Sequence, residues 1–219
     1  PGGIMHDWDL KTNIDGIYAA GDQLFASDCA GFACATGYYA GRKAADYSDT
    51  IEELAEIDQA EVDAERERLY APMNRTEGVT WKELNMAISK AMQNYCGGVK
   101  NDDLLIQGID LLKSYREEIV QQLYCNNPHE LMRTHEVLDI LDVSEMILQA
   151  CLMRKSSSKQ LCFYRSDYPQ MDPKEDHCFI TIRQENGVPV RGTVPGDYFG
   201  DLKTEYEKRN QDYIGGEAR

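Results

Sequence analysis

The residues best suited to do chemistry are a glycine and an aspartate that follow a short apolar run near the beginning of the 219-residue chain. The run Ile17 to Ala20 is predicted to form a β-strand that ends at Gly21 and Asp22. Gly21 permits a close approach of the backbone because it has no side chain. Asp22 places a carboxylate just beyond the strand, where its oxygens can accept hydrogen bonds from the hydroxyl groups of a sugar.

A segment rich in alanine and glycine follows, residues 30–45, and is predicted to form a helix that can pack closely on a ligand. Free N–H groups at the start of a helix stabilise negative charge. Near Ala33 and Cys34 those groups would serve whatever side chain is present. The alternative is that Gly-Asp closes an ordinary strand and the helix packs in an ordinary core.

The order of apolar strand, Gly-Asp and small-residue helix resembles the second FAD fingerprint of flavoproteins that have two dinucleotide-binding folds. The resemblance implies that FAD is the cofactor and that Gly21 and Asp22 hold its ribityl chain. It further implies that backbone N–H groups near Ala33 and Cys34 face the pyrimidine edge of the flavin. Cys34 is also a candidate for a redox role, with simple packing near the flavin as the alternative.

The Gly-x-Gly-x-x-Gly loop that holds the pyrophosphate in such proteins does not occur in the sequence. The chain also begins at Pro1, without an initiator methionine. We therefore expect the C-terminal portion of a longer flavoprotein, whose missing N-terminal part would be a partner in the same protein and would supply the ADP-binding loop.

Residues 49–155 are predicted to be almost entirely helical, because helix-start signals recur along them. Two are capping boxes, in which a threonine precedes a glutamate by three residues; two are asparagines, the second followed by a proline. These four starts are Thr50, Thr80, Asn101 and Asn127, and the helices predicted from them are 50–71, 80–95, 102–124 and 128–154.

After Ser158 the apolar pattern changes to that of strands. Strands are predicted at 161–164 and 178–182, and Asn186-Gly187 is predicted to turn the chain into a further strand at 188–190. The last dozen residues are polar and predicted to be loosely held. The expected fold is α+β. Its three parts are the C-terminal edge of an FAD-binding α/β domain (1–47), a helical bundle domain (49–155) and a small β-containing tail (156–219).

The segment Tyr164-Arg165-Ser166-Asp167-Tyr168-Pro169 narrows the resemblance to the fumarate reductase/succinate dehydrogenase flavoprotein family, which includes the adenylylsulfate reductase α subunit. The implied activity is that of an FAD-dependent oxidoreductase, with an iron–sulfur electron-transfer subunit as a possible partner. The alternative is a non-catalytic helical module that docks such a partner. Arg165 and Asp167 are predicted to form a buried ion pair that pins the tail to the bundle. No side chain is assigned as the catalytic acid or base.

The loop before the small-residue helix departs from the family pattern. Members that convert dicarboxylates carry an arginine in this loop, whereas Asp28 stands at about that position. A carboxylate there would repel succinate or fumarate, so the resemblance favours a branch similar to adenylylsulfate reductase or one of other specificity.

Composition excludes several other classes of protein. The formal charge of -15, from 38 acidic and 23 basic residues, argues against a nucleic-acid surface. No apolar run is long enough for a transmembrane segment. The cysteines are irregularly spaced without a Cys-x-x-Cys pair, which argues against zinc or iron–sulfur ligation and favours a reducing cytoplasm. They are Cys29, Cys34, Cys96, Cys125, Cys151, Cys162 and Cys178.

The histidines are weak candidates for chemistry. His6, beside Asp7 and Asp9, is predicted to lie in a surface hairpin. His129 and His135 are six residues apart on a helix and therefore point in different directions, which excludes a shared metal ion. His177, beside Asp176, is predicted to be exposed.

Overall fold

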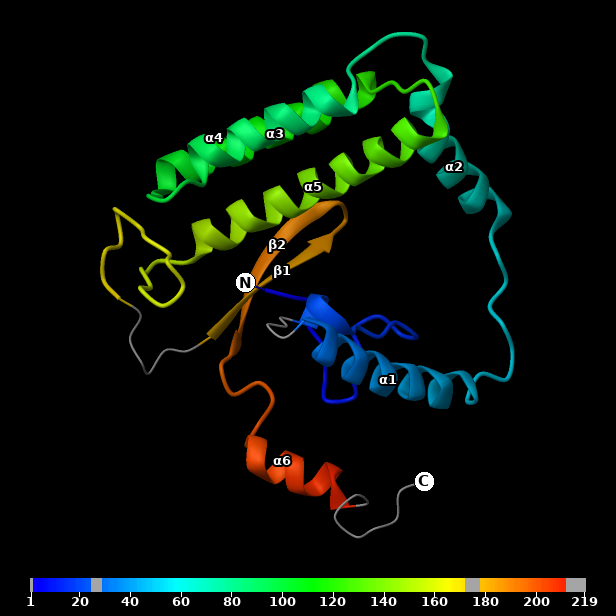
Figure 1. The fold of residues 1–219 in the computed structure, drawn as a ribbon, viewed down its shortest axis with the longest axis vertical. Coiled ribbons are helices and arrows are strands. Elements are labelled where there is room, and N and C mark those ends of the chain that lie inside the picture. The colour runs from blue at the N-terminus through cyan, green and yellow to red at the C-terminus, as the bar shows by residue number, and fades with distance from the viewer. Residues whose placement is uncertain (1, 25–28, 172–177, 212–219) are drawn as a thin grey trace. The chain divides into compact units, whose positions relative to one another are not determined.

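The structure is a computed structural model and describes residues 2–24, 29–171 and 178–211. The chain folds into two compact units, which are treated separately. One unit is Pro1–Glu56 together with Asp197–Arg219, and the other is Ile57–Gly196. Figure 1 shows the first unit in blue, dark orange and red and the second mainly in cyan, green, yellow and orange.

The first unit contains helix α1 (Cys29–Ser48), helix α6 (Leu202–Arg209) and an irregular N-terminal segment. The predicted strand Ile17–Ala20 is wrong as a regular strand, because its pairing is limited to one antiparallel bridge between Lys11 and Tyr18. Hydrogen bonds from Thr12 to Ile17 and from Ala19 to Leu10 close this loop, and Gly16 turns it with a φ of 79°. The segment lacks a neighbouring strand among the described residues, so it forms an isolated turn.

A charged cluster holds α6 to the rest of the first unit. The Asp9 carboxylate accepts hydrogen bonds from the Tyr39 hydroxyl at 3.0 Å and from the Arg209 guanidinium at 2.7 Å. The Trp8 indole N–H donates to the Phe199 carbonyl at 2.8 Å. The sequence analysis did not predict α6, because its residues are polar and none is buried; residues 212–219, also predicted to be loosely held, lie outside the described part of the chain.

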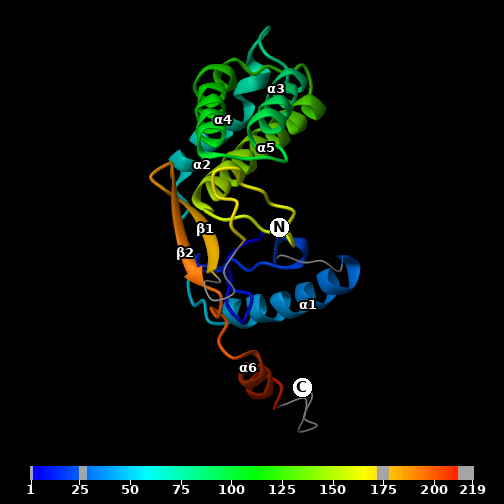
Figure 2. The same ribbon diagram turned by 90° about the vertical axis from the view of Figure 1, so that its left-hand side faces the viewer.

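The second unit is built on helices α3 (Trp81–Tyr95), α4 (Asp102–Ser114) and α5 (Pro128–Met153), which pack on one another. Figure 2 shows these three helices grouped together, and Figure 1 shows α2 (Gln59–Tyr70) beside one end of α5. Buried apolar residues from all three helices and from the loop before α5 form a single core. They are Leu84, Ile88, Ala91, Leu105, Ile109, Leu112, Leu123, Val137, Leu141 and Leu148.

Three of the four predicted helix starts are confirmed by their hydrogen bonds. The Thr80 hydroxyl and the Glu83 carboxylate form the predicted capping box at α3. Asn101 caps α4 and Asn127 caps α5, each through its side-chain oxygen. The start at Thr50 is wrong: its hydroxyl donates to the Tyr47 carbonyl at the end of α1 instead. Helix α2 begins only at Gln59, where the Asp58 side chain accepts from the Ala60 N–H.

The helix predicted for 102–124 also ends earlier than expected. Regular α-helix stops at Ser114 and gives way to a π-helical turn, Tyr115–Ile119, and then to a 3₁₀ turn, Val120–Gln122. The Val120 N–H donates to the Tyr115 carbonyl five residues back. Such a turn absorbs an extra residue in the helix, which the apolar pattern alone does not reveal.

The predicted hairpin is confirmed. Strand β1 (Cys178–Glu185) pairs antiparallel with β2 (Val188–Pro195), and Asn186 and Gly187 turn between them with φ values of 51° and 78°. This is the left-handed conformation that Asn-Gly turns favour. The hairpin contacts α5 (Figure 1). The strand predicted at 161–164 is wrong: Phe163 makes only an isolated bridge to Ser158. The α+β class is confirmed; the boundaries of the three predicted domains stay a prediction.

Candidate cofactor-binding site

Gly21 lies where a tight turn meets helix α1. It begins a short 3₁₀ helix (Gly21–Leu24), is buried, and has a φ of 71°, which favours glycine. Its N–H donates to the Thr36 hydroxyl at 2.9 Å, and that hydroxyl donates in turn to the Phe32 carbonyl at 2.7 Å. A side chain at Gly21 would extend to within 3.6 Å of the Ala33 Cβ. Two of the predicted residues, Gly21 and Ala33, are therefore neighbours.

Asp22 follows Gly21 in the 3₁₀ helix, and its side chain is exposed. The turn that buries Gly21 thus leaves the next carboxylate free to accept hydrogen bonds from a ligand. The structure shows no charged partner for this carboxylate among the described residues.

The start of α1 carries small residues and no acidic residue in its first turn. Ala33 is half-buried toward Gly21, whereas Cys34 and Gly31 are exposed. A Cβ added at Gly31 or Gly37 would meet no atom within 4 Å, so this surface has room for a ligand. The positive end of the helix dipole is therefore not neutralised by a side chain of its own first turn.

The sequence analysis missed Thr36 as part of this arrangement. Its hydroxyl accepts the hydrogen bond that fixes Gly21 and bonds back to its own helix. The only signal in the sequence is a lone polar residue among alanines and glycines four positions after Phe32. Asp28, the residue expected to face the substrate, lies outside the described residues.

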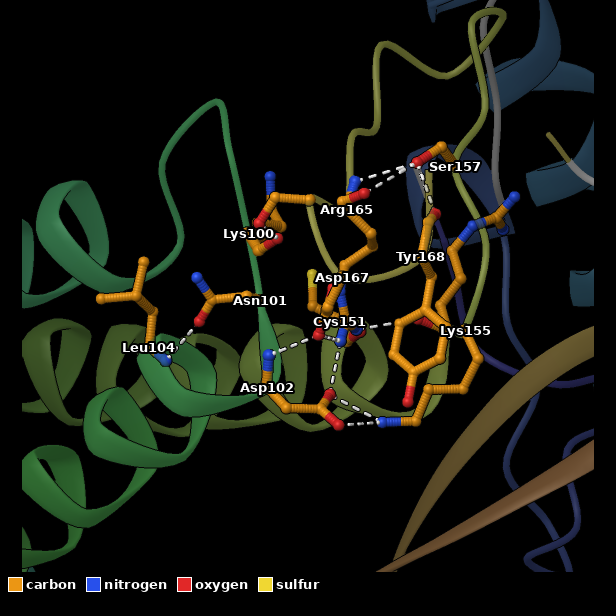
Figure 3. Close-up of polar contacts among 12 residues, drawn as sticks. Lys100, Asn101, Asp102, Leu104, Cys151, Lys155, Ser157, Arg165, Asp167 and Tyr168 are labelled. Carbon is orange, nitrogen blue, oxygen red and sulfur yellow. Dashed lines mark hydrogen bonds and ion pairs between the residues drawn. The ribbon is translucent and has the colours of Figure 1, made fainter. Parts of the chain in front are cut away.

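The second unit contains a fully buried arginine, and Figure 3 shows the side chains that surround it. Arg165 binds the Asp167 carboxylate with two hydrogen bonds, from Nε at 2.9 Å and from Nη2 at 2.7 Å. Nη1 donates to the carbonyls of Cys151 at 2.7 Å and Arg154 at 2.8 Å. Nη2 also donates to the Asp102 carboxylate. All five guanidinium donors are used.

The tail around Arg165 is tied to the bundle by backbone contacts as well. The Lys100 N–H donates to the Tyr164 carbonyl, and the Ser166 N–H donates to the Lys100 carbonyl. The buried Ser157 hydroxyl accepts from the Arg165 N–H at 3.0 Å and donates to the Tyr168 carbonyl at 2.9 Å (Figure 3). The predicted ion pair of Arg165 with Asp167 is confirmed, and it pins the tail to the ends of α4 and α5.

These contacts lower the pKa values of two aspartates. Hydrogen bonds from Arg165 hold the pKa of Asp167 well below its usual range. The Asp102 pKa is lowered mainly by the hydrogen bonds from Lys155, at 2.6 and 2.7 Å, and then by Arg165. Asp102 and Lys155 could not be predicted from the sequence, because an acidic residue in the first turn of a helix, such as Asp102 in α4, is common without any partner. Because all of its guanidinium donors are bound within the protein, we assign Arg165 a structural role.

The histidines are not brought together. His135 hydrogen-bonds the Leu69 carbonyl at 2.9 Å and so connects α5 with α2, whereas His6 contacts the adjacent Asp7 carbonyl. Across the described residues, no group of three or more His, Cys, Asp and Glu side chains is arranged to hold a metal ion. Within the same ranges, no helix combines the length and apolar character needed to cross a membrane.

The fold resembles that of part of several solved chains, at sequence identities below 25%. The structure resembles adenylylsulfate reductase from Archaeoglobus fulgidus, with a TM-score of 0.78 and 23% identity over 85% of this chain. It also resembles the Mycobacterium smegmatis Sdh1 complex (TM-score 0.70, 19% identity, 99% of this chain). The E. coli quinol fumarate reductase gives a TM-score of 0.69 at 20% identity over 88% of this chain.

Residues 85–191, slightly less than half of the chain, match the family model of the fumarate reductase flavoprotein C-terminal domain. The resemblance to fumarate reductase/succinate dehydrogenase-type flavoproteins is therefore confirmed. The alignments cover 32%, 40% and 36% of the three solved chains, so this chain spans about a third to two fifths of their length. No curated protein sequence matches the chain. Gly21, Asp22, Ala33 and Cys34 lie outside the matched range.

Proposed function

We propose that the chain is the C-terminal part of an FAD-dependent oxidoreductase and that residues 1–47 contribute the ribityl and isoalloxazine side of its flavin site. The observation that supports this most is the packing of Gly21 against Ala33, with the Gly21 N–H bound to Thr36. This packing brings an exposed carboxylate, Asp22, next to a helix start that has no acidic residue. The match of residues 85–191 to the flavoprotein family model supports the same proposal.

The residues present fit FAD. A ribityl chain offers hydroxyl donors, and the exposed Asp22 carboxylate is an acceptor. The flavin ring is flat and large, and the open surface at Gly31 and Gly37 has no atoms where side chains would otherwise stand. The pyrimidine edge gains negative charge on reduction, which the N–H groups near Ala33 and Cys34 would stabilise.

When bound, FAD would accept a hydride or an electron pair, and the protein would bind and orient it. In this chain Gly21 and Asp22 would orient the ribityl chain, and the first turns of α1 would orient the ring. The catalytic acid and base stay unassigned. Because adenylylsulfate reductase is among the similar structures, a related specificity is part of this proposal, as is the expectation that Asp28 disfavours fumarate and succinate.

The test is the flavin content of the Asp22→Ala variant of the full-length protein. A hydrogen bond to a charged group contributes about 1.5–3 kcal/mol, so the FAD dissociation constant should rise about tenfold to more than a hundredfold. Asp49→Ala is the matched control, because Asp49 is an exposed aspartate in the turn after α1. Unchanged flavin content in the Asp22 variant would refute its assignment.

The alternative is a non-catalytic docking module for an iron–sulfur electron-transfer partner. It is favoured by apolar side chains left exposed on α5, where Ile140, Val143 and Ile147 recur at helical spacing and are 43%, 48% and 43% exposed. A purified full-length protein that is yellow supports the flavoenzyme, whereas a colourless protein that still binds an iron–sulfur subunit supports the module. A cytoplasmic location belongs to the same proposal and is tested by cell fractionation.

A further inference from the structure

The ends of helices α3 and α5 bring two cysteines together. The Cys96 and Cys151 sulfur atoms lie 3.8 Å apart and share a hydrogen bond, although 55 residues separate them in the sequence. No other pair of thiols is in hydrogen-bond contact among the described residues, and all seven cysteines are free. Neither residue belongs to the proposed flavin site. We propose that Cys96 and Cys151 are a peroxide-sensitive dithiol that closes to a disulfide.

The position of Cys96 allows the two sulfur atoms to approach. A disulfide has a sulfur–sulfur distance of about 2.05 Å, so the pair must close by less than about 2 Å. Cys96 caps the C-terminus of α3 and is followed by Gly97 and Gly98. A helix end next to two glycines adjusts more easily than a helix interior. Cys151, in the last turn of α5, is held by the hydrogen bond from Arg165 to its carbonyl.

The surroundings make Cys96 the nucleophile. The pKa of Cys96 is lowered to about 7, mainly by the hydrogen bond with Cys151 and also by the nearby Lys100 ammonium, against the effect of burial. The same hydrogen bond, with burial, raises the pKa of Cys151. Cys96 therefore carries the thiolate while Cys151 keeps its proton. Lys100 is 9% exposed and donates to the Gly97 carbonyl at 2.7 Å, which fixes its charge near the pair.

The reaction has two steps. The Cys96 thiolate attacks one oxygen of hydrogen peroxide; the S–O bond forms, the O–O bond breaks and hydroxide leaves, so that sulfur is oxidised to a sulfenic acid by two electrons. The Cys151 sulfur then attacks the Cys96 sulfur. The S–S bond forms, the S–O bond breaks, and the departing hydroxide takes the Cys151 proton to give water. Both thiols are half-buried, so a small oxidant is the class that fits.

The experiment treats the full-length protein with one equivalent of hydrogen peroxide and maps its disulfides by mass spectrometry. We expect a single cross-link between the Cys96 and Cys151 peptides, the loss of two titratable thiols, and their return with a dithiol reductant. In Cys151→Ser the Cys96 sulfenic acid should persist and be trapped by dimedone. Cys125→Ser is the control and should behave as the unaltered protein, since Cys125 is 2% exposed and burial raises its pKa.

Two results would overturn the proposal. One is a protein that retains both thiols after treatment while a different cysteine is oxidised. The other is a Cys151→Ser variant whose Cys96 resists both dimedone trapping and alkylation at neutral pH. If the serine variant does not fold, Cys151→Ala and the thiol titration of the unaltered protein decide between the same two outcomes.

Discussion

Among single residues, Arg165 connects the tail to helices α4 and α5 because each of its guanidinium donors has a partner. A lysine at this position has three donors on one nitrogen and cannot reproduce the planar fork that binds Asp167 and the two carbonyls. Lysine keeps the positive charge but leaves some of these acceptors without a hydrogen bond, and an unsatisfied buried acceptor costs about 1–3 kcal/mol. Arg165→Lys should therefore lower the free energy of unfolding by about that amount.

Urea unfolding of Arg165→Lys, followed by circular dichroism, measures the loss. Arg133→Lys is the matched control, because Arg133 pairs with Glu136 on the exposed surface of α5. An exposed pair contributes about 0–1 kcal/mol, so this variant should unfold near the unaltered protein. Equal stability of the two variants would show that Arg165 is replaceable.

The same cluster predicts a dependence on acid. Because the folded state lowers the pKa values of Asp167 and Asp102, their contribution to stability is complete above the unfolded-state pKa of an aspartate, about 3.9. It is lost as the pH falls below that value, since the unfolded state then binds more protons. Urea midpoints measured from pH 7 to pH 3 should drop mainly below about pH 4. In Asp167→Asn the drop should be smaller; an identical drop would assign it to other carboxylates.

Some contacts of these residues can be predicted from the sequence, and others cannot. The pair Arg165 and Asp167 was predictable because the residues are two positions apart in a recognisable segment. Asp102, Lys155 and Ser157 were not, since their proximity depends on how α4 and α5 end. For the proposed flavin site, Gly21 and Ala33 were predicted and lie together, whereas Thr36 joined them only through tertiary contact.

At the scale of elements, helix packing depends on one glycine. A Cβ added at Gly108 in α4 would lie 2.7 Å from the Tyr95 Cβ and 3.2 Å from the Leu148 side chain. Alanine normally favours a helix over glycine by about 1 kcal/mol, but overpacking of a core costs about 1–3 kcal/mol. Because the nearest atom is a Cβ close to the backbone, the clash should prevail and Gly108→Ala should be less stable.

Thermal unfolding measures whether Gly108→Ala is less stable than the unaltered protein. Gly98→Ala serves as the control in the same unit, because a Cβ added there meets no atom within 4 Å; its stability should change by no more than about 0.5 kcal/mol. A stabilised Gly108→Ala variant would show that α3 and α5 can move away from α4 without loss of stability.

The start of a helix could be predicted from the sequence where a local capping residue determines it. Thr80, Asn101 and Asn127 begin helices because their side chains accept hydrogen bonds from N–H groups three residues on. Thr50 carries the same sequence pattern, yet its hydroxyl bonds back to Tyr47. The pattern does not distinguish a threonine that begins a helix from one that follows the end of another.

At the scale of the whole molecule, the sequence lacks the glycine-rich loop on which the FAD pyrophosphate rests. Since that contact supplies a large share of dinucleotide binding, we expect residues 1–219 alone to bind FAD with a dissociation constant above about 1 μM. Calorimetric titration of FAD into this chain measures the constant. Sub-micromolar binding would mean that α1 and the Gly21 turn hold the cofactor without help.

The buried Arg165 also bears on how the protein is made. A ribosome releases the chain from its N-terminus, so α3, α4 and α5 can all form before Arg165 has been added. Until then the contacts of Arg165 with the Asp102 carboxylate and with the carbonyls of Cys151 and Arg154 cannot form. Asp102 and Arg165 are 63 positions apart. We expect their contact to form late in folding, because the chain between them must be ordered first. We therefore expect the contacts at this end of the bundle to be completed only after synthesis passes Asp167.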